Sequence, residues 1–161
     1  MARNLVVYCS SHGTTEKAAQ LLGVSLDGEV EVIDLNKKKA SDIASYDSII
    51  IGGSIHAGNI QRKLKQFMQK NHEILLTKKL GLFLCCYREG EEAKTQFETV
   101  FPQDLRDHAK SEGLFGGEFI FSKMSFLSRK IINKIVGVST DQSNFSTDLV
   151  QEFADRFNHA S

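Results

Sequence analysis

Residues 10–15 read Ser-Ser-His-Gly-Thr-Thr, between an apolar strand pattern (Asn4 to Cys9) and a helical pattern (Thr15 to Leu26). A short turn of hydroxyl residues with one glycine, placed between a strand and a helix, directs backbone N–H groups and hydroxyls at a single point. The helix dipole adds partial positive charge there. We therefore expect this turn to bind a phosphate group through Ser10, Ser11, His12, Gly13, Thr14 and Thr15.

Two widespread nucleotide-binding loops do not fit this turn. A nucleoside triphosphate loop, G-x-x-x-x-G-K-[ST], needs a lysine, and the turn has none. A dinucleotide loop needs three glycines for close approach to a pyrophosphate, and only Gly13 is present. Asp34 falls about where the ribose-binding acid of such a loop would lie, but we interpret it as a strand-end residue. The turn favours a terminal monophosphate; the alternative is that it only caps the helix, since Ser and Thr are common N-caps.

Composition indicates one domain, residues 1–161, in a reducing compartment. The 20 Lys and Arg residues balance the 20 Asp and Glu residues, so net charge gives no reason to expect a nucleic acid partner. Cys9, Cys85 and Cys86 lie in strand-like runs, and adjacent cysteines rarely pair, which indicates reduced thiols in a cytoplasmic protein and no metal site. No apolar run approaches the ~20 residues that span a bilayer.

Short apolar runs alternate with helical patterns, as in a parallel sheet covered on both faces. The expected strands are Leu5 to Cys9, Val30 to Leu35, Ser48 to Ile51, Leu80 to Cys86 and a segment from about Glu112 to Phe121. Helical patterns fill the intervals between these strands. A weak turn is expected at Ala40 to Ser45, and an amphipathic helix through Ile60, Leu64, Phe67 and Met68. Further helical patterns run through Ala93 to Phe97 and after Pro102, and a last helix is expected near Asn144 to Asn158. The fold class we predict is α/β, a doubly wound five-stranded parallel sheet of order 2-1-3-4-5 with helices on both faces.

Sheets of this kind bind ligands beyond the carboxyl ends of their strands, where the strand order reverses. In the order 2-1-3-4-5, the loops Ser10 to Thr15, Gly53 to Asn59 and Cys86 to Gly90 meet there. The phosphate of the ligand is expected on the first loop, and the remainder of the ligand between the second and third.

The turn at Ser10 to Thr15 is similar to the [ST]-x-T-G-x-T signature of the flavodoxin family, with His12 in place of the usual threonine. Tyr46-Asp47, followed by Ile49 to Ser54, resembles the entry of that family into its third strand. Within the family, the loop Gly53-Ser54-Ile55-His56-Ala57-Gly58 is most similar to the flavodoxin-like, FMN-dependent protoporphyrinogen dehydrogenase group. That group has an insertion near its last strand, and Phe121 to Gln142 looks like a shortened form of it.

The resemblance implies FMN as the cofactor. Ser10, His12, Gly13, Thr14 and Thr15 would hold the ribityl phosphate. The flavin ring would lie against the two other loops, whose residues are Ser54, Ile55, His56, Ala57, Gly58, Asn59, Cys86, Tyr87, Arg88, Glu89 and Gly90. The implied function is that of an oxidoreductase that oxidises protoporphyrinogen IX with a quinone or another acceptor. The alternative is an electron shuttle between redox proteins without its own substrate, and a flavodoxin-like interaction module that has lost its ligand is a third interpretation.

Two departures from the family bear on these alternatives. Flavodoxins stack aromatic side chains on the flavin ring, but Ala57 stands where an aromatic residue is expected, and Tyr87 is the only aromatic residue of the two ring loops. Flavodoxin carriers are generally acidic, whereas this chain is neutral. The neutral charge favours a more specialised partner than a plain carrier has.

Four further features of the sequence concern the chemistry. Gly58 is the expected hinge of a peptide beside the ring, since glycine permits rotation at little steric cost. His56 either acts as a proton or charge partner near the ring or faces solvent, and Cys85 and Cys86 fit small buried strand residues better than reactive thiols. Ser122 to Gly137 forms a basic amphipathic pattern. This segment would touch the inner face of a membrane, bind a partner protein, or pack as an ordinary helix.

Overall fold

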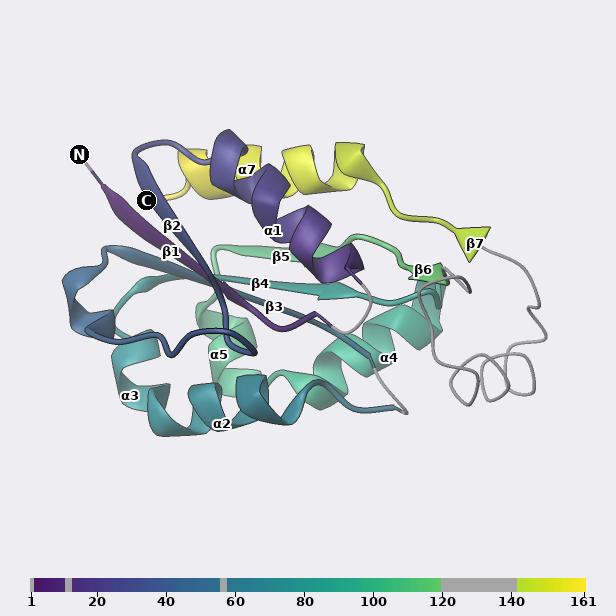
Figure 1. Cartoon of the computed structure of the whole chain (residues 1–161), viewed down its shortest axis with the longest axis horizontal. Coiled ribbons are helices and arrows are strands. Elements are labelled where there is room, and N and C mark those ends of the chain that lie inside the picture. The colour runs from purple at the N-terminus through teal and green to yellow at the C-terminus, as the bar shows by residue number, and fades with distance from the viewer. Residues whose placement is uncertain (1, 11–12, 56–57, 120–141) are drawn as a thin grey trace.

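The structure, a computed structural model, describes residues 2–10, 13–55, 58–119 and 142–161. Its centre is a five-stranded parallel sheet with the strand order β2-β1-β3-β4-β5 (Figure 1). The strands are β1 (Arg3–Tyr8), β2 (Glu29–Asp34), β3 (Ser48–Ser54), β4 (Lys79–Cys85) and β5 (Ser111–Leu114). The predicted fold class and strand order are confirmed.

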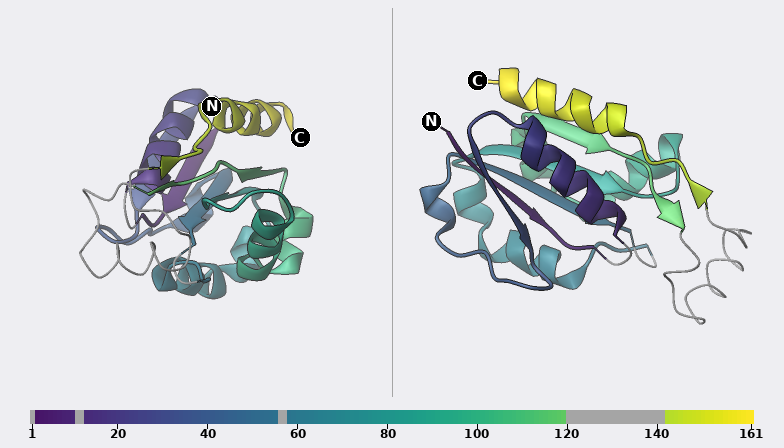
Figure 2. Two further views of the ribbon diagram at one scale, coloured as in Figure 1. Left: turned by 90° about the vertical axis from the view of Figure 1, so that its right-hand side faces the viewer. Right: turned by 45° about the horizontal axis from the view of Figure 1, so that its top comes forward.

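Helices cover both faces of the sheet (Figure 2). One face carries α1 (Thr14–Ser25) and α7 (Thr147–His159), which lie side by side. The other face carries α2 (Arg62–Lys70), α3 (His72–Leu75), α4 (Gly90–Val100) and α5 (Gln103–His108), and the 3-10 turn η1 (Ile43–Ser45) precedes β3. Within the described residues, no helix is long and apolar enough to cross a membrane.

The central strands are apolar on both faces because helices cover both. Ile49, Ile50 and Ile51 of β3 are fully buried. A Cβ atom at Gly52 would stand 1.9 Å from Cζ of Phe83, so the glycine makes room for the phenylalanine ring. That ring stacks on Phe115 with 5.0 Å between the ring centroids, which builds an aromatic core under α7.

The last helix is fastened to the first by hydrogen bonds as well as by this core. The side chain of Asn158 accepts a hydrogen bond from the N–H of Asp27 (3.0 Å) and donates one to the main-chain oxygen of Ser25 (3.1 Å). Phe153 and Phe157 of the same helix are buried against the sheet. Helix α7 therefore covers the part of this sheet face that lies beside α1.

The expected strand from Glu112 to Phe121 is wrong as a single element. β5 ends at Leu114, and a two-residue strand β6 (Glu118–Phe119) pairs antiparallel with β7 (Gln142–Ser143) instead of continuing the sheet. The reason is local: Phe115 turns into the core, and Gly116 takes the left-handed φ of +80° next to the backbone of Asn144.

Other boundaries differ more modestly from the expected ones. β3 continues through Gly52 and Gly53 to Ser54, because these residues pair with Phe83, Leu84 and Cys85 of β4. The short helix α3 had no counterpart among the expected elements, and the weak turn expected at Ala40 to Ser45 is limited to η1. The last helix begins at Thr147 rather than near Asn144, because the Ser146 hydroxyl accepts a hydrogen bond from the N–H of Leu149 (3.2 Å).

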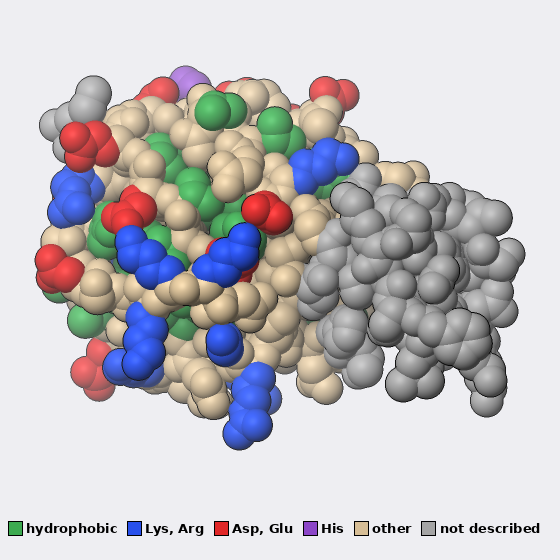
Figure 3. Space-filling view, in the orientation of Figure 1, with side chains coloured by type: hydrophobic (Ala, Val, Ile, Leu, Met, Phe, Trp, Pro, Cys, Tyr) green, Lys and Arg blue, Asp and Glu red, His purple; other side chains and the backbone are tan. Residues whose placement is uncertain are grey.

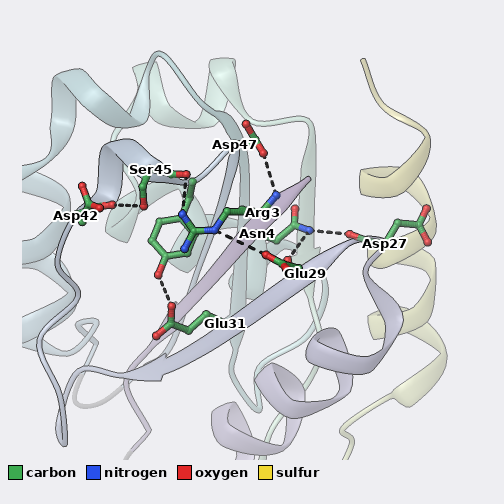
Figure 4. A network of polar contacts seen from close by, with 9 residues as sticks. Arg3, Asn4, Asp27, Glu29, Glu31, Asp42, Ser45 and Asp47 are labelled. Atoms are coloured by element: carbon green, nitrogen blue, oxygen red, sulfur yellow. Dashed lines mark hydrogen bonds and ion pairs between the residues drawn. The ribbon is translucent and has the colours of Figure 1, made fainter. Parts of the chain in front are cut away.

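A polar network closes the amino end of the sheet (Figure 4). The N–H of Arg3 donates to Oδ2 of Asp47 (2.8 Å), and its guanidinium donates to the main-chain oxygen of Ser45 (3.2 Å). The side chain of Asn4 donates to the main-chain oxygens of Asp27 (2.7 Å) and Glu29 (3.1 Å). The loops at this end are therefore tied to β1, and the opposite, carboxyl end of the sheet carries the loops expected to bind a ligand.

Candidate functional site

The three loops predicted to share a ligand follow neighbouring strands at the carboxyl edge of the sheet. The strand order reverses between β1 and β3, and β4 lies next to β3. Backbone pairing continues past the strand ends, since the N–H of Cys9 donates to Gly52 (3.4 Å) and the N–H of Ile55 donates to Cys85 (3.4 Å). The loops after these strands therefore begin side by side.

The first loop leads into α1 without a side-chain cap among the described residues. Gly13 is the N-cap residue, with a left-handed φ of +93°, and among the described residues no side chain caps the helix there. The hydroxyl of Ser10 accepts a hydrogen bond from the N–H of Gly13 (2.9 Å), which ties the end of β1 to the start of α1. No atom lies within 4 Å of the place where a Cβ of Gly13 would stand. The geometry does not favour a turn that serves only as a cap, because a helix start without a side-chain cap leaves N–H groups for a ligand.

Thr15 gives the first loop an unsatisfied buried donor. Its side chain is 1% exposed, and Oγ1 has no hydrogen-bond partner among the residues that the structure describes. A buried hydroxyl without a partner costs about 1–3 kcal/mol. Thr14 beside it is also buried. The arrangement fits an anionic oxygen at the helix start, which would accept the hydroxyl proton in a hydrogen bond. Ser11 and His12 lie outside the described residues.

Asn36 positions this loop, although the sequence analysis did not single it out. Its side-chain amide donates to the main-chain oxygen of Ser10 (3.2 Å), and its N–H donates to Oδ1 of Asp34 (2.9 Å). Asp34 is the last residue of β2, as interpreted, and its carboxylate bonds within its own turn. An aspartate followed two residues later by an asparagine at a strand end is a turn signal that would have pointed to this contact.

The second loop is anchored by Gln61, which was not predicted as a site residue. Its Oε1 accepts a hydrogen bond from the N–H of Ser54 (3.1 Å), and its Nε2 donates to the hydroxyl of Ser54 (2.6 Å). Ile55 is half-buried against the core, Gly58 has a φ of +81° with no atom within 4 Å of a Cβ position, and Asn59 is exposed. His56 and Ala57 lie outside the described residues.

The third loop contains a buried thiol and an exposed rim. Cys86 is 7% exposed, and burial raises the pKa of its thiol to about 11. Its Sγ donates to the main-chain oxygen of Arg88 (3.7 Å), and Arg88 forms an exposed ion pair with Glu92 at 3.5 Å. Gly90 is the first residue of α4. Burial of both Cys85 and Cys86 agrees with the interpretation that these are small strand residues rather than reactive thiols.

Asn144 fixes the third loop from a distant part of the chain. Its Nδ2 donates to the main-chain oxygen of Tyr87 (2.9 Å) and to Oε1 of Glu89 (2.7 Å), and its Oδ1 accepts from the N–H of Gly117 (2.8 Å). A Cβ at Gly117 would stand 2.8 Å from the N–H nitrogen of Tyr87, so the two segments are in close contact. The contacts join the half-buried Tyr87 to the segment that follows β7.

No group of three or more His, Cys, Asp or Glu side chains that could hold a metal ion occurs in the part of the chain that the structure describes. The candidate site consists of the start of α1, with Gly13 and Thr15, and of the two further loops that follow β3 and β4.

The comparison with family profiles gives one match, to the flavodoxin domain, over residues 5–146. This match contains β1 from Leu5 onward, the other four strands of the sheet and all three loops. The chain belongs to the flavodoxin domain family. The search of curated proteins found no match.

Solved structures share the flavodoxin fold over the whole chain. Oxidised Flavodoxin 1 from Bacillus cereus is 19% identical, with a TM-score of 0.62, and the alignment covers 99% of this chain and 100% of that one. The two-electron reduced flavodoxin of Megasphaera elsdenii is 18% identical (TM-score 0.61; 98% and 99% covered). A WrbA-like flavodoxin from Agrobacterium tumefaciens is 16% identical (TM-score 0.59; 99% and 95% covered). At these identities the likeness establishes the fold.

Proposed function

We propose that this flavodoxin-family protein binds FMN and carries electrons between redox proteins, without a substrate of its own. The observation that carries the proposal is the start of α1. The helix begins at Gly13 without a side-chain cap among the described residues, and the hydroxyl of Thr15 in its first turn is buried without a hydrogen-bond partner there. Membership in the flavodoxin domain family supports the same ligand. The alternative of a module that has lost its ligand is less favoured, because a ligand-free module has no reason to keep an unsatisfied buried hydroxyl.

The residues of the first loop fit the phosphate of FMN. A phosphate dianion at a helix start is stabilised by backbone N–H groups and by the helix dipole. The Thr15 hydroxyl would donate to a phosphate oxygen, and Ser10 would hold the turn through its bond to the N–H of Gly13. A cationic side chain is not required, which agrees with the absence of lysine from residues 10–15.

The other two loops would orient the ring. FMN supplies one- and two-electron transfer when bound, so the protein has to place the ring and adjust the relative energies of its oxidation states. Gly58 can present either face of its peptide because its positive φ and open surroundings leave it room to rotate. Tyr87 is the aromatic residue of the third loop, and Asn144 donates a hydrogen bond to its main-chain oxygen.

Titration of the FMN-free protein tests the proposal, with riboflavin as the matched control ligand that lacks the phosphate. We expect FMN to bind at least 100-fold more tightly than riboflavin, which corresponds to about 2.7 kcal/mol for the phosphate contacts. Calorimetry and quenching of flavin fluorescence both measure this ratio. Equal affinities would show that the start of α1 does not hold the phosphate. Failure of both ligands to bind would overturn the proposed function.

Oxidation of protoporphyrinogen IX with a quinone is the more specific prediction from the sequence. It depends on the loop through His56 and Ala57 and on the segment from Phe121 to Gln142, most of which lies outside the described residues. Turnover of protoporphyrinogen IX by the FMN-loaded protein, measured against buffer, separates this enzyme from a carrier. The carrier proposal predicts no turnover above buffer. Contact of Ser122 to Gly137 with a membrane, also untested, would appear as flotation with anionic vesicles.

A further inference from the structure

Every charged residue of helix α2 is basic. Arg62, Lys63, Lys65 and Lys70 are all exposed, and the sequence has no Asp or Glu between Ser48 and His72. Blue side chains project from the lower edge of the molecule in Figure 3, the region where Figure 1 places α2. Since the whole chain is neutral, this surface is a local excess of positive charge. We call these four residues the α2 basic surface.

The α2 basic surface has no carboxylates of its own to neutralise it. In the described part of the chain, ion pairs engage other cations, among them Arg3 with Glu29, Lys38 with Glu31 and Arg88 with Glu92. None of the described ion pairs includes a residue of the α2 basic surface. Unpaired like charges on adjacent helical turns repel one another, so they lower the stability of an isolated helix. An acidic partner would remove that cost.

A groove of about 500 Å³ runs beside the α2 basic surface, between α2 and the end of α4. Its lining includes Arg62, Lys65, Gln66 and Gln69 from α2, and Thr99 and Val100 from the end of α4. Two cations and two side-chain amides supply donors for carboxylate groups that enter the groove. The groove therefore has both the space to hold acidic side chains and the donors to form hydrogen bonds with them.

The α2 basic surface starts next to the second loop of the candidate site. Asn59 and Ile60 line the groove and belong to the segment that leads from this loop into α2. Gln61, directly before the helix, holds both the N–H and the hydroxyl of Ser54 at the start of the loop. A protein docked on α2 would therefore lie beside the expected position of the flavin ring.

We propose that the α2 basic surface and its groove dock the acidic surface of a protein redox partner. The proposal rests on the proposed function, because it places that partner beside the flavin site. A lipid surface is the less favoured occupant. Interfacial helices insert an apolar face into the membrane, whereas the apolar side chains of α2, namely Leu64, Phe67 and Met68, are buried in the core.

Electrostatic docking of this kind acts mainly on the rate of encounter and depends on salt. Complementary surface charges raise association rates by about 10- to 1000-fold at low ionic strength, and the gain disappears as the screening length falls from about 30 Å at 0.01 M salt to about 8 Å at 0.15 M. The four cations of the α2 basic surface thus predict binding that weakens with salt.

A plant-type [2Fe–2S] ferredoxin, which is an acidic protein, serves as the probe. Calorimetric titration of the FMN-loaded protein with oxidised ferredoxin at about 20 mM salt measures docking without any electron transfer. Stopped-flow mixing with reduced ferredoxin measures the transfer of one electron from the cluster to the bound flavin. We expect binding and a fast transfer rate, both of which fall at least tenfold at about 300 mM salt.

The variant Arg62→Glu/Lys65→Glu should weaken ferredoxin binding and slow the low-salt transfer at least tenfold, and Arg62→Gln/Lys65→Gln should fall between it and the unaltered protein. Lys110→Glu is the matched control: Lys110 is exposed and directly precedes β5, at the amino end of an edge strand, whereas α2 begins at the carboxyl end of the sheet. FMN affinity and melting temperature are expected to stay unchanged in all three variants, which distinguishes lost docking from lost folding.

The outcomes separate this inference from the proposed function. If the protein binds no FMN, the proposed function fails, and the inference that rests on it fails too. If FMN binds but charge reversal on α2 leaves ferredoxin binding and transfer rates equal to those of Lys110→Glu, only the docking proposal is overturned. Charge-dependent binding to phosphatidylserine vesicles, with no effect of the same variants on ferredoxin, would also overturn it in favour of a membrane surface.

Discussion

The Nδ2 atom of Asn144 lies 2.9 Å from the main-chain oxygen of Tyr87, 57 positions earlier in the chain, and donates a hydrogen bond to it. The same amide group also donates to Glu89 and accepts from Gly117, so its donors and its acceptor are all engaged. The third loop of the candidate flavin site therefore takes its shape from a contact outside its own strand and helix.

Asn144→Asp should disturb this loop with little change in volume. A carboxylate in place of the amide faces the Tyr87 oxygen and the Glu89 carboxylate without a donor, so two hydrogen bonds are lost and like charges meet. We expect FMN affinity to fall about tenfold, or about 1.4 kcal/mol, together with a shift of the flavin midpoint potential. The second variant Glu89→Gln, in the same chain, should restore part of the affinity because its amide can donate to Asp. If Glu89→Gln restores none of the lost FMN affinity, the hydrogen bond between Asn144 and Glu89 does not contribute to FMN binding.

Thr15→Val should affect the FMN-free and FMN-bound proteins in opposite directions. The hydroxyl of Thr15 is buried and unpartnered in the described structure, so replacing it with a methyl group should leave the free energy of unfolding unchanged or raise it by up to about 1 kcal/mol. FMN affinity should fall by about 10- to 100-fold, since a charge-assisted hydrogen bond to phosphate is lost. Denaturant unfolding and FMN titration measure the two effects. Thr15→Ser is the control that keeps the hydroxyl, and a clear loss of stability in Thr15→Val without FMN would show that the hydroxyl has a protein partner.

Gly58→Val should shift the potential of the first electron taken up by the flavin. The φ of +81° at Gly58 is costly for a β-branched residue, by about 1–3 kcal/mol, although no atom lies within 4 Å of the Cβ position. We expect a shift of roughly 60 mV, the equivalent of a tenfold change in a one-electron equilibrium, in a spectroelectrochemical titration. Gly58→Asn is the control because asparagine tolerates positive φ. An unchanged potential in Gly58→Val would rule out Gly58 as a hinge.

Tyr46→Phe should reduce stability at neutral pH but not at low pH. The Tyr46 hydroxyl donates to the Glu31 carboxylate, and this bond is the main reason why the pKa of Glu31 is lowered. A lowered carboxyl pKa contributes stability above the unfolded value of about 4.3, and the contribution is lost as pH falls through the folded value. Because Glu31 is largely solvated, we expect less than about 1 kcal/mol at pH 7. The difference between the melting temperatures of the two proteins should shrink as pH falls below about 4.3 and close once the pH lies below the folded pKa of Glu31, and a difference that does not shrink would contradict the assignment.

The thiols of Cys9 and Cys86 should resist alkylation in the folded protein. Burial is the main cause that raises both pKa values to about 11, with Asp34 adding to the effect at Cys9. At pH 8 only about one thiol in a thousand is then ionised, compared with roughly a quarter in an unfolded chain. Labelling by iodoacetamide, followed by mass spectrometry, should be at least 100-fold slower in the folded than in the urea-unfolded protein. Fast labelling of Cys86 in the folded state would mean that the third loop opens readily.

The features that depend on local sequence were the ones that could be predicted. The alternation of apolar runs such as Ile49 to Ile51 with helical patterns is a local signal, and the parallel sheet predicted from it is confirmed. The turn at Ser10 to Gly13 also carries its own signal, and the anion site predicted from it stays a prediction. The break between β5 and β6 depends instead on where the Phe115 ring packs and on the approach of Asn144 to Gly116, and neither is encoded within the segment itself.

The supporting residues of the site were missed for the same reason. Asn36, Gln61 and Asn144 are single polar residues whose functions depend on partners in other loops, 26, 7 and 57 positions away. A single sequence contains no signal for such pairs beyond the turn chemistry near Asn36. The roles predicted for His56 and for Ser122 to Gly137 stay predictions, because these residues lie outside the described ones.

The fastening of α7 to α1 through Asn158 has a consequence for biosynthesis. During translation, the sheet face under α7 should lack its cover until residues 147–159 have left the ribosome, although the three ligand loops precede that helix in the chain. Phe83 and Phe115, which belong to the core cluster of α7, would be incompletely buried in that interval. We therefore expect the nascent chain to stay sensitive to protease, and to take up its cofactor stably only after this helix has emerged.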